Sequence, residues 1–165
     1  MTTTPSNTTT TENHESVFSI QRVYLKDCSF EAPGTPSIFR EEWQPNVDFE
    51  LQIFHQKLAD DVYEVVIAGT ATASVNKKVA FLAEVKQAGI FTMKNLPDDQ
   101  LPLLLNIVCP NILFPYFREV ISSLTVRGTF PQLTLDPINF EALYKQRLAQ
   151  EAEKTTVAQG STTIQ

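Results

Sequence analysis

The chain has 165 residues, of which 42% are hydrophobic, and its formal net charge at pH 7 is −6. This length and composition are typical of one compact domain with short polar ends. The acidic balance leaves no basic surface for nucleic acid or for an anionic membrane, and it favours solubility and attraction to basic partners.

Both ends of the chain are polar, and we expect both to be disordered. Residues 1–15 form a Thr-rich run without Lys, Arg or an apolar core, which excludes a signal peptide. Residues 151–165 form a second polar tail. No apolar stretch approaches the roughly 18 residues that a membrane helix needs. The sequence therefore predicts one folded domain over residues 16–150 and no direct insertion into a membrane.

The first part of this domain has the patterns of β-strands. Residues 17–25 are rich in β-branched and aromatic residues and predict a strand, and a loop containing Pro and Gly follows over residues 33–45. Strict alternation of apolar and polar residues then predicts a second strand from Val47. Its apolar face carries Val47, Phe49, Leu51 and Ile53. Its polar face carries Asp48, Glu50 and Gln52.

Two longer apolar runs follow, over residues 62–75 and 79–90. Only the three residues Asn76-Lys77-Lys78 separate them, so a β-hairpin is expected. Both faces of each run are partly apolar, whereas a sheet with one face in water shows a cleaner division. A domain of this size has few helices to cover both faces. We therefore expect the surplus apolar surface to contact another subunit, a bound polypeptide, or both.

The last third of the domain is predicted to be helical. Prolines interrupt residues 101–114, so an irregular or short helical piece is expected there. A regular helix is expected from Pro115, which suits a first turn, to Gly128, which suits the C′ position. A final helix is expected after the candidate N-cap Asn139. Its apolar stripe comprises Phe140, Leu143, Tyr144 and Leu148. Strands followed by helices predict an α+β domain.

The sequence offers little for catalysis. Neither His14 nor His55 has a Cys or His partner at metal-ligand spacing, and the glycines form no phosphate-binding loop. Cys28 and Cys109 are expected to be free thiols in a reducing compartment, the second as a small buried hydrophobe. Three pairs of carboxylates lie in predicted loops, where solvated turn residues are the default: Glu41-Glu42, Asp60-Asp61 and Asp98-Asp99. We therefore expect no enzymatic activity, no cofactor and no metal.

Several separate segments of the domain together match a known pattern. The two most specific are Cys109-Pro110-Asn111-Ile112-Leu113-Phe114-Pro115-Tyr116 and Arg127-Gly128-Thr129-Phe130-Pro131-Gln132-Leu133. The others are Ile20-Gln21-Arg22-Val23-Tyr24, Ser29-Phe30-Glu31-Ala32-Pro33, Trp43-Gln44-Pro45, residues 58–66 and Gly89-Ile90-Phe91. In this order, from about residue 19 to residue 143, they resemble the SecB family of protein-export chaperones.

The resemblance implies a four-stranded antiparallel sheet with C-terminal helices packed on one face. It also implies dimers that join their sheets, and a homotetramer in which two dimers pack helix against helix. A member of this family would be a cytoplasmic, ATP-independent holdase. It would keep precursor proteins unfolded and export-competent and deliver them to the motor ATPase SecA.

The resemblance also assigns two sets of site residues. The expected SecA contact is an acidic patch of Asp27, Glu31, Leu82 and Glu84, although its three acids also fit ordinary solvated side chains. The expected client groove is lined by Trp43, Phe49, Leu51, Ile90 and Phe91. Phe49 and Leu51 fit the domain core equally well, whereas Trp43 lies in a predicted loop, where a large aromatic often anchors recognition.

Two details leave alternatives open. Lys86 adds a positive charge close to Glu84, which weakens the expected acidic patch. The apolar surface also fits an adaptor that serves one dedicated partner, as a chaperone in a toxin–antitoxin system would. A small enzyme with an unrecognised site is a third, weaker hypothesis.

Overall fold

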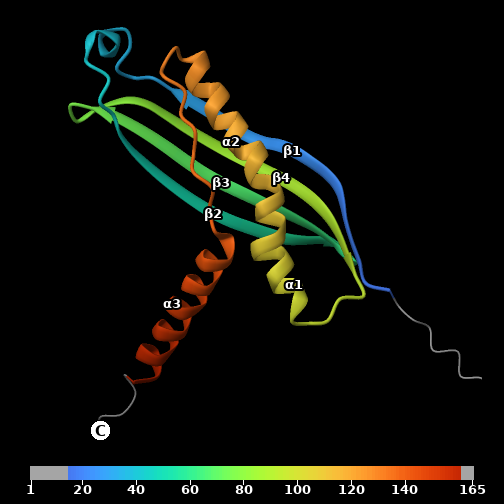
Figure 1. Cartoon of the computed structure of the whole chain (residues 1–165). Coiled ribbons are helices and arrows are strands. Elements are labelled where there is room, and N and C mark those ends of the chain that lie inside the picture. Colours follow the sequence, from blue (N-terminus) through green and yellow to red (C-terminus); the bar gives the residue numbers. More distant parts are fainter. Residues whose placement is uncertain (1–14, 161–165) are drawn as a thin grey trace, which may run out of the picture.

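The computed structural model describes residues 15–160, with side chains described for residues 15–155. A four-stranded antiparallel sheet forms one layer, and helices cover one of its two faces (Figure 1). This confirms the predicted α+β architecture with helices on one face. Apart from Glu15, the expected N-terminal tail lies outside the described residues, as does the end of the chain beyond residue 160.

The four strands are long, and their order in the sheet differs from their order in the chain. They are β1 (Val17–Glu31), β2 (Asn46–Ala59), β3 (Val62–Val75) and β4 (Lys78–Lys94). The sheet order is β1-β4-β3-β2, and all neighbours are antiparallel. The loop between β1 and β2 contains a short 3₁₀ helix, η1 (Ser37–Arg40). β1 and β2 are therefore edge strands, each with one row of backbone groups that this sheet does not pair.

The turn between β3 and β4 is one residue shorter than predicted. Val75 already pairs with Lys78, which leaves Asn76 and Lys77 as the two turn residues. Both have positive φ angles, of 50° and 65°. Two left-handed residues in succession are the signature of a tight hairpin turn whose twist matches that of the strands. The predicted hairpin is confirmed with this correction.

A continuous helical run crosses the sheet, although prolines were expected to break it. It consists of α1 (Gln100–Leu103), the π-helical segment η2 (Leu104–Val108) and α2 (Cys109–Arg127). Pro110 lies in the first turn of α2 and Pro115 lies farther inside it, and because η2 leads into α2 without a break, both prolines are internal to the continuous run. An internal proline costs about 3 kcal/mol. Burial of the apolar side chains in this run is large enough to offset it, because each contributes about 1.5–3 kcal/mol.

This helical run is also strongly apolar. Its 28 residues, Gln100–Arg127, are by length and composition alone sufficient to cross a membrane. The expectation that no stretch has this length is wrong, because the prolines do not end the helix. The buried side chains of the run pack against the sheet as the domain's core helix, which accounts for its apolar character.

α3 (Phe140–Gly160) starts at the predicted cap. The side-chain oxygen of Asn139 accepts a hydrogen bond from the backbone N–H of Ala142 at 3.0 Å. The helix continues to Gly160, ten residues beyond the predicted end of the folded domain. Ala, Glu, Lys and Gln make up much of this stretch, and these are strong helix formers.

The end of α2 differs from the prediction in one detail. Gly128 has a φ of −77°, and the left-handed position belongs to the next residue, Thr129, with a φ of 59°. Gly128 is instead required for space, because a Cβ atom there would lie 2.6 Å from Cζ of Phe30 on β1. The missing side chain thus allows the end of α2 to approach the sheet.

The core lies between the helices and the sheet face that they cover. Its larger cluster includes Val65, Ile67, Val85, Phe91, Leu113, Phe114, Phe117, Ile121 and Phe140. Gly69 on β3 permits the close approach of α2, since a Cβ atom there would lie 2.5 Å from Cζ of Phe117. A smaller cluster contains Phe81, Phe130 and Trp43. We call the opposite sheet face, which no described helix covers in Figure 1, the outer face.

Candidate binding groove and outer sheet face

All four residues of the predicted SecA contact lie on the outer face. Asp27 on β1 is opposite Lys86 on β4, and Glu31 is opposite Leu82. Glu84 is two residues from Leu82 and so shares its face. Leu82 is half-buried and the three acids are exposed. The structure brings these side chains onto one surface, and their binding of SecA stays a prediction.

The sequence analysis did not include one further acid in this patch. Glu50 on β2 is opposite Thr70 on β3, which in turn is opposite Glu84 on β4. Asp27, Glu50 and Glu84 border one shallow hollow of about 250 Å³, together with Lys86. The alternation in β2 did predict that Glu50 lies on a polar face. Only the strand order shows that this face adjoins Glu84.

A buried carboxylate also lies on the outer face. Glu64 is only 4% exposed, and its carboxylate accepts three hydrogen bonds. The donors are the hydroxyl of Tyr24 at 2.5 Å, the ammonium of Lys26 at 2.7 Å and the amide of Gln56 at 2.6 Å. Ala88 on β4 lies opposite Tyr24 of β1 and opposite Val66 of β3, so the Tyr24 side chain reaches across β4 to Glu64. This network joins side chains of β1, β2 and β3 across the sheet.

The network changes the proton affinities of its members. Burial alone would raise the pKa of Glu64, but the hydrogen bonds from Lys26, Tyr24 and Gln56 outweigh it and lower that pKa below its usual value. Burial, with the hydrogen bond to Glu64, raises the pKa of Tyr24 to about 12. Glu64 is therefore ionised and fully paired at neutral pH, which makes it a structural centre of the outer face.

The five predicted client-groove residues do not form one surface. Trp43 is half-buried and packs against the smaller core cluster, with its ring 5.6 Å from that of Phe130. Phe91 is fully buried in the larger cluster and cannot contact a client in this conformation, so its assignment is corrected to core. Ile90 is opposite Glu64 and therefore lies on the outer face. Successive residues of a strand point to opposite faces, which separates Ile90 from Phe91.

Phe49 and Leu51 lie on the helix-facing side of β2, as their alternation predicted. Both are half-buried, and the ring of Phe49 is 6.0 Å from that of Phe117 in α2. Both pack against the larger core cluster. Phe49 is therefore mainly a core residue, whereas Leu51 also borders the groove described next.

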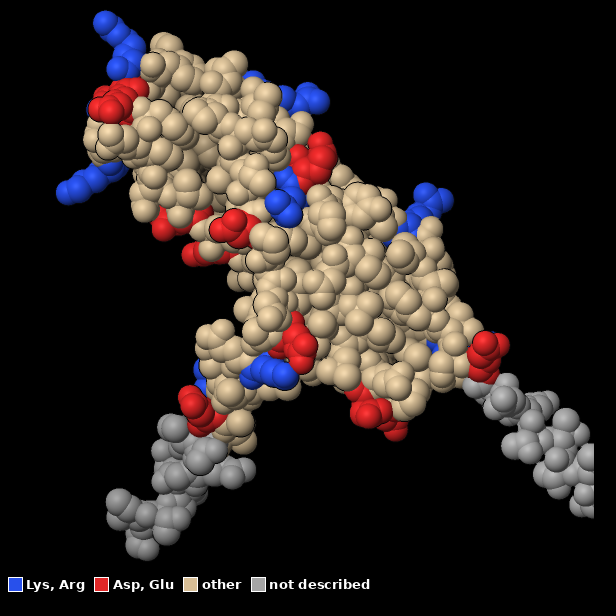
Figure 2. Space-filling view, in the orientation of Figure 1, with Lys and Arg blue, Asp and Glu red and all other residues tan. Residues whose placement is uncertain are grey.

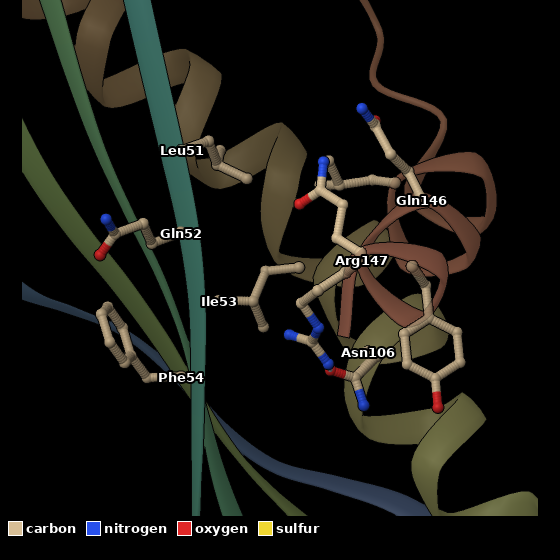
Figure 3. A pocket seen from close by; sticks show the side chains of 10 residues that line it. Leu51, Gln52, Ile53, Phe54, Asn106, Gln146 and Arg147 are labelled. Carbon is tan, nitrogen blue, oxygen red and sulfur yellow. The ribbon is translucent and has the colours of Figure 1, made fainter. Parts of the chain in front are cut away.

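An open groove of about 440 Å³ lies between the edge strand β2 and α3 (Figure 3). Leu51 and Ile53 point from β2 toward α3, while Gln52 and Phe54 point to the other side of the strand (Figure 3). The lining residues are Leu51, Gln52, Ile53, Phe54, Asn106, Leu143, Tyr144, Gln146, Arg147 and Gln150. Leu143 is 38% exposed, and Leu51 and Ile53 are half-buried. The groove therefore presents large apolar side chains to water beside an unpaired sheet edge.

Polar contacts hold one cation in this groove. Nη2 of Arg147 on α3 donates a hydrogen bond to Oδ1 of Asn106 in η2 at 2.8 Å. The buried Asn106 is itself held, since its Nδ2 donates to the carbonyl of Pro102 at 2.8 Å. The guanidinium of Arg147 lies 5.5 Å from the ring centre of Tyr144. Partial burial, together with the charge of Arg147, lowers the pKa of nearby His55.

Sequence reasoning missed most of this groove. It placed Leu143 and Tyr144 on the apolar stripe of α3, but it left Asn106 and Arg147 unassigned. These two residues are 41 positions apart and share no motif. Their contact depends on how α3 docks against the π-helical segment, for which the sequence contains no local signal.

The groups that could support catalysis are not arranged for it. Cys109 is fully buried, as predicted, and burial raises the pKa of its thiol to about 12, so it is not a nucleophile at neutral pH. Over the part of the chain that the structure describes, no three His, Cys, Asp or Glu side chains come together as metal ligands.

Comparisons with known proteins place the chain in a family. Over residues 11–151 the sequence matches the family described as preprotein translocase subunit SecB. The structure is similar to the Mycobacterium tuberculosis Rv1957 SecB-like chaperone in complex with a ChAD peptide from the Rv1956 HigA1 antitoxin. The TM-score is 0.59 and the identity is 17%, over 73% of this chain and 90% of that chain.

A second similar structure adds little. A protein of unknown function from Streptococcus agalactiae is 11% identical over 74% of this chain and 99% of that chain, but its TM-score of 0.37 is too low to compare folds. The match to the family covers most of the sequence, and the fold shared with Rv1957 agrees with it. The chain therefore belongs to the SecB family, whose members are chaperones and not enzymes.

Proposed function

We propose that this protein is an ATP-independent cytoplasmic holdase that keeps precursor proteins unfolded and delivers them to SecA. The groove between β2 and α3 is the observation that supports the proposal most strongly. It combines exposed apolar side chains with the unpaired edge of β2. Unfolded polypeptides expose apolar side chains and unpaired backbone groups, and this groove complements both features.

The binding energy available to such a surface is sufficient without ATP. Burial of about 1,000 Å² of apolar client surface corresponds to roughly 25 kcal/mol before costs. Ordering of the flexible client and its lost freedom offset most of this amount. A client that folds hides its apolar side chains and is released. Slow-folding precursors would therefore be held, and fast-folding proteins would escape.

Further exposed apolar side chains support the proposal that the chain forms a homotetramer. They lie on β1 and along the helical run: Val17, Phe18, Ile20, Leu25, Leu103, Val108, Tyr116 and Val126. Figure 2 shows that charged side chains lie mainly at the margins of this view, with broad neutral surface between them. Pairing of β1 edges and packing of helices between dimers would cover both regions. Sedimentation velocity should then show a tetramer of 18.5 kDa chains, and a monomer would contradict it.

Delivery to SecA is proposed to use the acidic patch on the outer face. Asp27, Glu50 and Glu84 lie on the outer face, whereas Leu51 and Ile53 enter the groove from the helix-facing side of β2, so a client and the motor could be bound together even though Gln52 lines both hollows. A basic partner segment would be attracted quickly and in a salt-sensitive manner. Lys86 lies opposite Asp27 and reduces the negative charge of the patch, which would weaken this attraction.

A second candidate function is that of an adaptor with one dedicated partner. The similar Mycobacterium protein is described with a peptide from an antitoxin, which favours this alternative. Both functions can use the same groove, and they differ in selectivity. A holdase captures many unrelated unfolded proteins, whereas an adaptor captures only its cognate partner.

Capture of unfolded proteins tests the proposal. Several unrelated proteins, reduced and diluted from denaturant, would be mixed with the wild-type chain, and complexes would be separated by size. We expect capture of most of them. Leu143→Glu, inside the groove, should weaken capture about tenfold or more, because a charge would have to be buried with each client.

The matched control is Leu148→Glu on the same helix, which places the same charge at a 44% exposed position that does not line the groove. This variant should capture clients like the wild type. Capture of none of the unfolded proteins would refute the holdase proposal, and capture of one alone would favour the adaptor. Equal loss of client capture in both variants would refute the assignment of client binding to the groove.

A further inference from the structure

One charged side chain lies among the ten that line the groove. It is the guanidinium of Arg147, and no carboxylate belongs to the same lining. Figure 3 shows it pointing from α3 toward Ile53 on β2, into the space between the two elements. A cation in an apolar groove that binds polypeptides has a direct consequence for which segments fit there.

Arg147 is held in place but is not saturated. Asn106 accepts one hydrogen bond from Nη2, and Tyr144 supports the guanidinium plane. Glu151, one turn along α3, forms an ion pair with Arg147, but its oxygen lies 3.7 Å from Nε, so the pair leaves the N–H donors of the guanidinium without a hydrogen bond to Glu151. A guanidinium has five N–H donors, so several remain for a ligand. The side chain is 44% exposed, which makes them accessible from the groove.

We propose that the groove selects extended segments in which one Asp or Glu is flanked by apolar residues, with Arg147 binding the carboxylate. This inference rests on the proposed holdase function and specifies the class of segment that it binds. The guanidinium matches a carboxylate in two parallel hydrogen bonds, while apolar neighbours of the acid contact Leu143 and Ile53. The chain's net charge of −6 would repel acidic ligands elsewhere, so the preference is local.

The test uses three short, unstructured peptides that are identical except for a central Glu, Gln or Lys between apolar residues. Their affinities for the full-length protein are measured by fluorescence anisotropy in about 0.15 M salt, where charges more than about 8 Å apart are screened. For a partly exposed ion pair, we expect the Glu peptide to bind about three- to fivefold more tightly than the Gln peptide. The Lys peptide should bind most weakly.

Two variants assign the effect to one residue. Arg147→Gln keeps a donor for Asn106 and should remove the preference for Glu over Gln, while the Gln peptide binds as before. Lys145→Gln removes a positive charge from the same helix outside the groove lining and should retain the preference. Circular dichroism checks that both variants are folded. If one variant does not fold, the peptide series on the wild-type protein still decides whether the groove prefers Glu.

The outcomes separate two kinds of failure. Equal binding of the Glu and Gln peptides by the wild-type protein would overturn the role of Arg147 and leave the holdase function standing. Equal loss of the Glu preference in both variants would show that the preference comes from the overall positive charge of α3 and not from Arg147. If none of the three peptides binds, the proposed groove fails, and this inference fails with it.

Discussion

The buried carboxylate of Glu64 makes a strong prediction about stability. Glu64→Gln removes the charge but preserves the shape, so the amide oxygen can still accept from Tyr24 or Gln56. Hydrogen bonds to a charged group contribute about 1.5–3 kcal/mol each. The contribution of Lys26 is discounted because that side chain is 42% exposed and regains water. We expect a loss of about 2 kcal/mol, or about 4–8 °C in melting temperature for a chain of this size.

The effect of this substitution must depend on pH. The pKa of Glu64 is lower in the folded state than its usual value of 4.5. The ionised carboxylate therefore stabilises the fold above pH 4.5, and this stabilisation is lost as the pH falls through the folded-state pKa. The difference between the wild type and Glu64→Gln should be full at pH 7 and should shrink below pH 4.5.

Thermal unfolding at fixed protein concentration, followed by circular dichroism at several pH values, measures both effects. The control is Glu84→Gln, which removes an exposed acid from the same face and should change stability by less than about 0.5 kcal/mol. If both variants melt at the wild-type temperature at pH 7, the argument for the Glu64 network is refuted.

Three further predictions concern other parts of the fold. Gly69→Ala should destabilise the protein by about 1–3 kcal/mol in denaturant titrations, because the added Cβ would meet Phe117 at 2.5 Å; unchanged stability would contradict this packing. Tyr24 should ionise near pH 12, and the protein should lose stability between pH 10 and 12. Glu64→Gln should lower the pKa of Tyr24 only in part, because burial is the larger cause of the shift, and ultraviolet titration of tyrosinate measures the pKa in both proteins. Glu84→Lys should weaken SecA binding in surface plasmon resonance and leave client capture intact, and unchanged SecA affinity would refute that assignment.

The main features of the fold could be predicted from sequence because they depend on local patterns. Alternation in residues 47–53 placed Phe49 and Glu50 on opposite faces of β2, and the structure agrees. The hairpin of β3 and β4 and the cap at Asn139 follow equally local rules. The predicted break of the helix at the prolines was wrong. The cost of a proline can be read from the local sequence, whereas the burial that offsets this cost depends on tertiary packing.

The site was harder to predict, since it depends on strand order and on helix docking. The acidic patch could be assembled only through resemblance, and Glu50 joins it because β2 is two strands from β4 in the sheet. Phe91 was assigned to the groove together with Ile90, yet alternation alone separates the two residues. Arg147 could not be found, because nothing in the sequence near it indicates contact with Asn106.

The central claim is that unfolded polypeptides bind between the edge of β2 and α3. Hydrogen–deuterium exchange of the full chain, with and without a bound reduced and unfolded client, tests it most directly. Backbone amides of Asn46–Ala59 and of the first turns of Phe140–Gly160 should gain protection, while the outer-face acids Glu31 and Glu84 should lie in unchanged segments. Protection confined to other parts of the chain, with none along β2, would contradict the account.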